Sequence, residues 1–209
     1  MSMQTSLYLV KCLEEEKSMK ASIHSARQRI LTTATDLFSR EGYRAVGTDT
    51  IIERSGVAKM TLYRHFSTKN DLICAYIEQT IENFWAAFEQ VISEHPASPQ
   101  IALVAIFEML ASTVAEPGFC GCSCLHAAVE FPQFDHPAHQ VALEHKRDVR
   151  ARFLQLAEQA GARQPDILAD QLLLLMNGML MQGRMEGPID TTSSVVQAVK
   201  VLVDAQLKA

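Results

Sequence analysis

The segment 48–66 constrains the fold of this chain more than any other part of its sequence. It reads TDTIIERSGVAKMTLYRHF, which predicts two short helices joined at Gly56. A helix must stop at that position and the chain must turn, and glycine adopts the required left-handed conformation without steric strain. The apolar residues expected to hold the two helices at a steep angle are Ile51, Ile52, Val57 and Leu62. This arrangement is a helix-turn-helix.

The second helix of the pair carries hydrogen-bond donors on the side that we expect to face solvent. Ammonium, guanidinium, imidazole and hydroxyl groups suit phosphate oxygens and the edges of bases. The residues concerned are Lys59, Thr61, Tyr63, Arg64 and His65. Double-stranded DNA is therefore the leading partner.

The flanking sequence extends this pattern on both sides. A Phe-x-x-x-Gly-Tyr segment at 38–43 precedes it, and its second helix runs into Thr-Leu-Tyr-x-His-Phe-x-x-Lys at 61–69. Over about residues 25–75 the chain resembles the N-terminal DNA-binding domain of the TetR (tetracycline repressor) family of bacterial regulators. The resemblance implies a sequence-specific transcriptional regulator. We expect a repressor that a small-molecule effector releases from its operator.

The resemblance also implies a division of the DNA contacts, with the helix 59–65 in the major groove. The residues expected at base edges are Lys59, Met60 and Thr61, and those expected at phosphates are Thr48, Tyr63, His65 and Lys69. Arg64 would either hold a phosphate or form a salt bridge on the back of the helix. Leu62 and Phe66 are expected in the core. Ile52 departs from the usual pattern, because many such units have a small residue there, and its bulk could widen the angle between the helices.

The charge of the chain is divided unevenly along its length. The formal net charge is −5 at pH 7, but residues 20–69 hold nine Lys/Arg and four Asp/Glu, a balance of +5. Residues 70–209 hold eight Lys/Arg and seventeen Asp/Glu, a balance of −9, and residues 1–19 add −1. A basic head on an acidic body would orient the molecule on a polyanion such as DNA.

The rest of the chain has helical periodicity and no convincing alternating strand, so we predict an all-α fold. We expect an N-terminal extension at 1–19, the helix-turn-helix domain at 20–68, and a helical effector-binding and dimerisation domain at 69–209. Thr48 and Thr68 are expected to cap the helices that begin beside them. The remaining helices are predicted at about 24–41, 69–94, 100–115, 121–131, 138–159, 166–184 and 192–207.

The two helices predicted at 166–184 and 192–207 are apolar on more than one face, which is difficult to satisfy within one chain. We therefore predict a homodimer, and the resemblance implies that these helices pack against their copies as a four-helix bundle. A two-fold dimer would read a palindromic operator with half-sites about 34–36 Å apart. The alternative is that both helices are simply buried core.

An effector site is expected among aromatic, methionine and cysteine side chains of the larger domain. The resemblance implies a small effector, often hydrophobic or cationic and aromatic, and a wall rich in methionine adapts to varied shapes. The candidate residues are Trp85, Phe88, Phe107, Cys124, Phe131, Met176 and Met179. The alternative for each of them is a place in the ordinary core.

Three cysteines are crowded at Cys120, Cys122 and Cys124, with His126 close behind. The segment 119–132 resembles one found in a group of TetR-like regulators and identifies no ligand. On a helix only Cys122 and His126 would share a face, which argues against a ready-made metal site. Three interpretations stay open: packing cysteines near a pocket, a thiol sensor of redox state or electrophiles, and a metal-responsive site.

Other classes of protein find little support in the sequence. No nucleophile elbow, phosphate loop or dinucleotide-binding glycine pattern is present, so we predict no catalytic residue, cofactor or resident metal. An all-helical enzyme and a scaffold protein are the remaining alternatives. No run of ~18 apolar residues predicts a membrane span, and the cysteines form no secreted disulfide framework, so we expect a cytoplasmic protein. Met19 is an alternative start to Met1.

Overall fold

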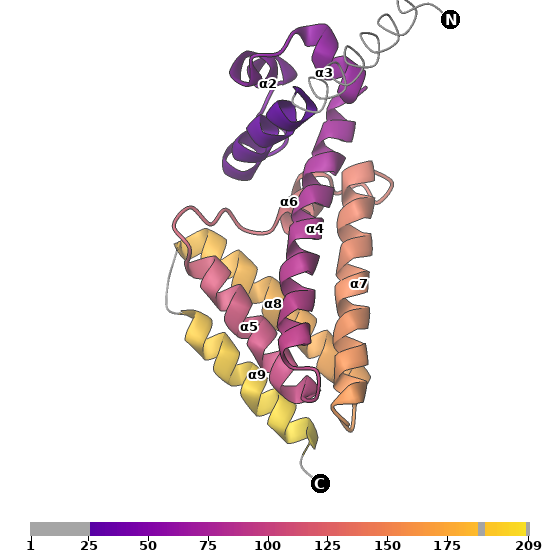
Figure 1. The fold of residues 1–209 in the computed structure, drawn as a ribbon, viewed down its shortest axis with the longest axis vertical. Helices are drawn as coiled ribbons and strands as arrows, with labels where there is room; N and C mark the ends of the chain where they lie inside the picture. Colours follow the sequence, from indigo (N-terminus) through magenta and orange to yellow (C-terminus); the bar gives the residue numbers. More distant parts are fainter. Residues whose placement is uncertain (1–25, 188–190, 208–209) are drawn as a thin grey trace, which may run out of the picture. The chain divides into compact units, whose positions relative to one another are not determined.

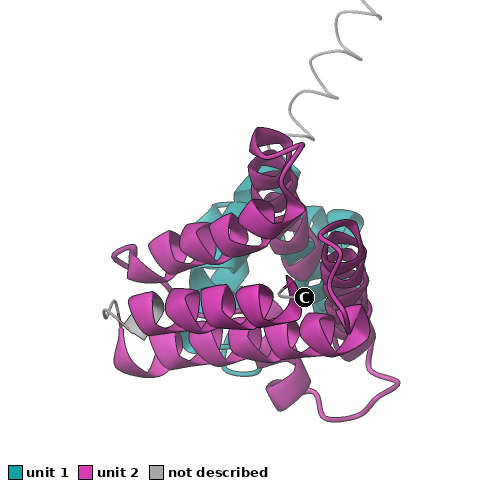
Figure 2. Cartoon of the chain, turned by 90° about the horizontal axis from the view of Figure 1, so that it is seen from below, with its two compact units in different colours: residues 1–76 teal, residues 77–209 magenta. Residues whose placement is uncertain are grey.

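The computed structural model describes residues 26–187 and 191–207. These residues fall into two compact units, divided after Tyr76, which we call the N-terminal unit and the C-terminal unit (Figure 2). The predicted extension at 1–19, the beginning of the helix predicted from residue 24, and the choice between Met1 and Met19 lie outside the described residues. Helix α4 (Lys69–Glu94) contributes its first two turns to the N-terminal unit and the rest to the C-terminal unit.

The N-terminal unit contains the first helix, described at 26–41, then α2 (Thr48–Ser55), α3 (Lys59–His65) and the start of α4 (Figure 1). The first helix ends as predicted at Gly42, which has a φ of 88° and donates its N–H to the Phe38 carbonyl at 3.1 Å. Three rings form the centre of this unit, with Phe38, Tyr43 and Tyr76 separated by 5.5, 5.8 and 6.0 Å between centroids. Tyr76 therefore belongs to this core although it lies two turns into α4.

The two predicted N-caps have different outcomes. Thr68 caps α4 as expected: its Oγ1 accepts the Asp71 N–H at 3.1 Å, while Asp71 Oδ2 accepts the Thr68 N–H at 2.9 Å. This reciprocal pair satisfies two amides that a helix N-terminus leaves free. The prediction for Thr48 is wrong, because Gly47 occupies the N-cap position in an extended conformation and Thr48 is the first residue of α2.

The C-terminal unit contains the rest of α4 and five further helices, and the described residues contain no strand. The prediction of an all-α fold is thus confirmed. The five helices are α5 (Pro99–Ala115), α6 (Ser123–Glu130), α7 (Pro137–Gln159), α8 (Pro165–Glu186) and α9 (Thr191–Leu207). Proline begins three of them, where its missing N–H leaves no helical hydrogen bond unmade. Helix α6 begins two residues later than predicted, because Gly121 has a φ of 87° and Cys122 is extended.

Helices α5, α7, α8 and α9 pack around one apolar core, with α8 against both α7 and α9 (Figure 1). The side chains of Phe88, Phe107 and Phe153 are fully buried in it. Helices α5 and α8 approach so closely at Gly183 that a Cβ there would lie 2.3 Å from Val114 Cγ1. A bidentate ion pair joins α7 to α4, with Arg152 Nε and Nη2 at 2.7 and 2.8 Å from the Glu89 carboxylate.

Candidate nucleic-acid interface and effector region

The turn between α2 and α3 is built on Gly56 as the sequence predicted. This glycine has φ 63° and ψ 32°, and its N–H donates to the Glu53 carbonyl at 3.3 Å. No atom lies within 4 Å of the place where a Cβ would stand, so the need for glycine is conformational and not steric. Ile51 and Leu62 are completely buried between the helices, while Ile52 is only half-buried.

Helix α3 has one buried face and one face that offers polar and flexible side chains to solvent. Leu62 and Phe66 are buried, which confirms their predicted place in the core. On the other face Met60 exposes 79% and Tyr63 37% of their surface. Lys59 and Arg64 are also exposed, and Thr61 is half-buried. The predicted base-edge residues therefore lie together at the start of an accessible helix.

The basic side chains of this face differ in what they contact. Lys59 Nζ lies 3.3 Å from Asp49 Oδ1, an exposed ion pair between α3 and α2. Lys69 Nζ lies 3.5 Å from the carbonyl oxygen of Arg44. Arg64 forms no salt bridge with an acidic side chain in the described ranges. The structure therefore gives no support to the alternative of a salt bridge on the back of the helix.

Two of the predicted phosphate contacts, His65 and Thr48, are less exposed to solvent than such a contact would require. His65 is half-buried, and its Nε2 atom is sealed from solvent without a hydrogen-bond partner among the described residues. Burial, followed by the charges of Arg64 and Arg27, lowers its pKa, which favours a neutral ring at neutral pH. Thr48 is also half-buried. The guanidinium of Arg27 lies 5.2 Å from the centroid of the Phe66 ring. Arg27 is therefore a further cation beside the end of α3, and the sequence did not lead us to predict it.

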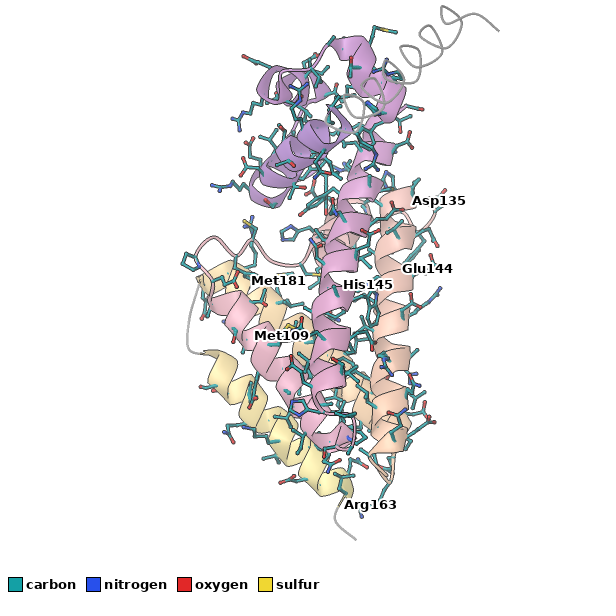
Figure 3. All side chains as sticks on the ribbon, viewed as in Figure 1. Met109, Asp135, Glu144, His145, Arg163 and Met181 are labelled. Atoms are coloured by element: carbon teal, nitrogen blue, oxygen red, sulfur yellow. The ribbon has the colours of Figure 1, made fainter. Side chains whose placement is uncertain are left out.

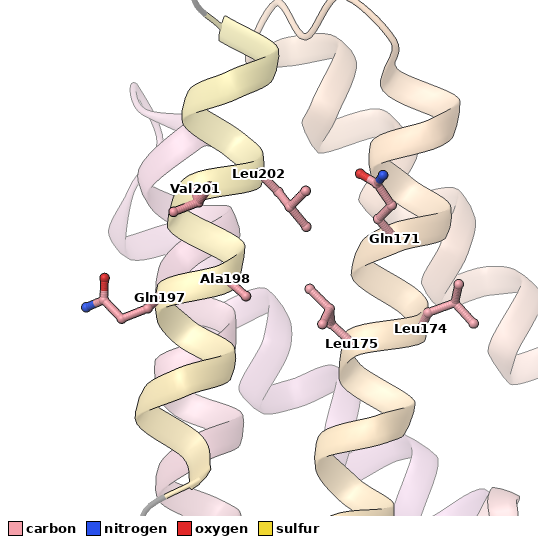
Figure 4. Close-up of a pocket in the computed structure, with 7 residues that line it drawn as sticks. All are labelled: Gln171, Leu174, Leu175, Gln197, Ala198, Val201 and Leu202. Carbon is pink, nitrogen blue, oxygen red and sulfur yellow. The ribbon is translucent and has the colours of Figure 1, made fainter.

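A second surface feature lies between α8 and α9 in the C-terminal unit. It is a groove with an almost wholly apolar lining, shown in Figure 4. Leu174 exposes 70% and Val201 66% of their surface along it, so the groove presents an exposed apolar patch. The lining residues are Gln171, Leu174, Leu175, Gln197, Ala198, Val201 and Leu202.

Comparison with known proteins agrees with this geometry. The family model described as "Bacterial regulatory proteins, tetR family" matches residues 30–76, which span the helix-turn-helix. The crystal structure of a TetR-family transcriptional regulator from Streptomyces coelicolor superposes with a TM-score of 0.85 and 30% identity, covering 88% of this chain and 97% of that one. This chain belongs to the TetR family.

Two curated relatives match part of this chain. The HTH-type transcriptional activator FasR of Mycolicibacterium smegmatis is 36% identical over 66 residues, 32% of this chain and 30% of the relative. An HTH-type transcriptional regulator of Staphylococcus aureus is 29% identical over 92 residues, 44% of this chain and 50% of the relative. The chain thus aligns with half or less of the length of these two relatives. They are regulators and not enzymes, as the sequence led us to expect.

The seven predicted effector residues of this TetR-family protein divide into two places. Phe88, Phe107, Met176 and Met179 are buried in the core of the C-terminal unit, and Trp85 packs against that core. Cys124 and Phe131 lie instead at the two ends of α6, where the Phe131 ring stacks on His136 with 4.0 Å between centroids. None of the seven lines the α8–α9 groove. Their role as an effector site stays a prediction.

The three crowded cysteines also separate. Cys120 Sγ lies 3.1 Å from the carbonyl oxygen of Gly118, whereas Cys122 and Cys124 interact with each other. The hydrogen bond from Cys124 and the charge of Lys146 lower the pKa of the Cys122 thiol to about 5, while the same bond and burial raise that of Cys124. In the described part of the chain no three His, Cys, Asp or Glu side chains are grouped to hold a metal ion.

Two histidines on α7 are buried, which the sequence did not lead us to predict. His139 exposes 9% of its surface, and its Nδ1 lies 2.8 Å from the Phe131 carbonyl oxygen. His145 exposes 6%, and its Nδ1 has no partner among the described residues. The signal was present in the sequence, since His145 continues an inward stripe that also contains Ala142, Val149 and Phe153. No helix in the described part of the chain combines the length and hydropathy that a bilayer crossing requires.

Proposed function

We propose that this TetR-family protein is a homodimeric regulator that binds a palindromic operator and represses transcription until a small effector releases it. The observation that carries this proposal is the face of α3, where Lys59, Met60 and Tyr63 are exposed above a buried Leu62 and follow a left-handed glycine turn. An exposed helix of this kind, held by its buried side, fits the major groove of DNA.

The contacts with DNA would divide between bases and backbone. Lys59, Met60 and Thr61 lie at the start of α3 and would read base edges. Tyr63, Arg64, Lys69 and Thr48 would hold phosphates, and His65 would do so only through Nδ1, because its Nε2 faces the interior. In the free protein Lys59 is paired with Asp49, so a base contact would replace that ion pair.

The α8–α9 groove would join two copies of the chain. A single recognition helix reads too few base pairs for an operator, and a two-fold dimer places two of them on successive half-sites. Leu174 and Val201 supply large exposed apolar surface on neighbouring helices, which a second copy would cover. The buried and unpartnered Oε1 of Gln171 would find a donor in the same interface.

An effector would act through the C-terminal unit. Helix α4 supplies residues to both units, so a ligand that shifts its C-terminal part would change the position of the helix-turn-helix. A coupling free energy of about 1–3 kcal/mol is enough to change operator affinity by 5- to 150-fold. The energy would come from a difference in effector affinity between the two states.

Footprinting of the purified protein on DNA from upstream of its gene, across a series of salt concentrations, tests this function. Protection of a pseudo-palindrome, with affinity that falls steeply as salt rises, is the expected result. Absence of protection at every salt concentration, on that DNA and on a random duplex pool, would refute DNA binding. A monomer at concentrations that give full protection would refute the dimeric mechanism alone.

A further inference from the structure

His145 lies on the side of α7 that faces α4 (Figure 3). Its ring is T-shaped against Phe84, at 5.1 Å between centroids, and against Trp85, at 5.8 Å. The side chain is 94% buried, since only 6% of its surface is exposed. The Nδ1 atom is sealed from solvent and has no hydrogen-bond partner within the described residues.

An unpartnered buried nitrogen is destabilising, and most proteins avoid one. The same helix shows the ordinary solution at His139, a second buried histidine whose Nδ1 lies 2.8 Å from the Phe131 carbonyl oxygen. The rings of Phe84 and Trp85 pack against His145, and its Nδ1 has no acceptor comparable to the Phe131 carbonyl at His139. A phenylalanine at 145 would remove the defect, but the chain has histidine there. An unsatisfied polar atom of this kind is expected where a ligand completes the site.

The charge state of this ring limits the chemistry of such a ligand. Burial, and to a lesser degree the charge of Lys146, lower the pKa of His145 to about 4. At neutral pH the imidazole is therefore uncharged, and it offers one nitrogen as donor and the other as acceptor. It attracts neither anion nor cation by its own charge, and hydrogen bonding is what it contributes.

We propose that His145 is the polar anchor of the effector site, and that it takes a small uncharged aromatic compound with a hydroxyl group, of the phenol class. A hydroxyl both donates and accepts, so it satisfies Nδ1 in either tautomer of the ring. The aromatic body of the ligand suits walls formed by Phe84 and Trp85. This inference rests on the proposed function, because it names the ligand to which the regulator would respond.

Entry to the site is through α4. Phe84 and Trp85 are only half-buried, so each of these neighbours of His145 is partly exposed to solvent. A ligand that reaches Nδ1 has to displace one of them. Both belong to the helix that supplies residues to the two units, which connects occupation of this site with the proposed release of DNA.

The probe is p-cresol, compared with p-xylene, which replaces its hydroxyl by a methyl group of similar size. Trp85 is the single tryptophan of the chain and touches His145, so its fluorescence, excited at a wavelength where cresol hardly absorbs, reports binding directly. We expect cresol to bind the full-length protein about tenfold tighter than xylene, the effect of one buried hydrogen bond. In His145→Phe, which keeps an aromatic ring, this ratio should fall to about one.

His139→Phe is the matched control, because it removes a buried histidine from the same helix. We expect it to lower Tm by several degrees, since it removes the hydrogen bond between His139 and the Phe131 carbonyl, and to keep the tenfold preference for cresol. His145→Phe should not lower Tm. A ratio that persists in His145→Phe, a ratio that His139→Phe abolishes equally, or the absence of any cresol-dependent change in the wild type would overturn the proposal.

The measurement also separates this inference from the proposed function. Fluorescence binding needs no DNA, so a protein that binds cresol through His145 but protects no operator would retain the site and lose the regulatory role. A protein that protects its operator but does not bind cresol would keep the role and lose the site.

Discussion

Replacing Leu174 by serine tests whether the α8–α9 groove joins two copies of the chain. Full burial of a leucine side chain contributes about 1.5–3 kcal/mol. Leu174 exposes 70% of its surface, so covering it would contribute about 1–2 kcal/mol in each copy. A two-fold dimer contains two such side chains, and the substitution should therefore weaken association by about 2–4 kcal/mol, or raise the dimer dissociation constant about 30- to 700-fold.

Sedimentation velocity over a dilution series measures this constant, and circular dichroism checks that the variant stays helical. Val129→Ser is the matched control, because Val129 exposes 72% of its surface on α6 and does not line the groove. It should leave the dissociation constant within about threefold of the wild type. An unchanged constant in Leu174→Ser, or an equal loss in both variants, would refute the assignment of the interface.

Three further predictions concern the DNA-binding face, the turn and the buried histidine. Lys69→Ala should weaken binding to all sequences and reduce the salt slope by about one, whereas Lys59→Ala should relax preference at one base pair, which titrations on operator variants would show. Gly56→Ala should lower the free energy of unfolding by about 1–2 kcal/mol in urea titrations, because φ is 63° there and alanine is strained in that conformation. A clash adds nothing to this cost, since no atom lies within 4 Å of the Cβ position. The pKa of His145 is about 4 in the folded protein, below the ordinary 6.5, so as the pH falls the unfolded chain binds this proton before the folded chain does. The free energy of unfolding should therefore decrease as pH falls from about 6.5 to 4. Urea unfolding across that range should show a smaller loss in His145→Phe; parallel curves would contradict the burial argument.

Local chemistry made much of this fold predictable from the sequence. The left-handed turn at Gly56 and the reciprocal cap of Thr68 and Asp71 depend on residues within a few positions of each other. Helix boundaries in the C-terminal unit follow proline and glycine positions in the same way. The N-cap of α2 was missed because Gly47 and Thr48 are both acceptable caps, and only backbone conformation distinguishes them.

The parts of the candidate sites that could not be predicted depend on how turns and helices place side chains against one another. His139 finds its hydrogen-bond partner in the Phe131 carbonyl, eight residues earlier in the chain, whereas His145 meets the rings of Phe84 and Trp85 on α4, which lies far from α7 in the sequence. The pairing of Cys122 with Cys124, and the separation of Cys120 from both, depend on where the chain leaves Gly121 and enters α6. Residue spacing alone left those alternatives open.

The ion pair between Lys59 and Asp49 bears on how a regulator of this kind leaves the wrong sequence. An exposed pair of this type contributes about 0–1 kcal/mol, whereas a good contact with a base discriminates by about 1–3 kcal/mol. Lys59 therefore has a resting partner that only a better acceptor replaces. If Lys59 reads a base edge as proposed, on unsuitable DNA it would stay with Asp49, whose carboxylate would then lie near the polyanion. The ion pair would then act as a threshold and would shorten the time that the protein spends on sites with weaker acceptors.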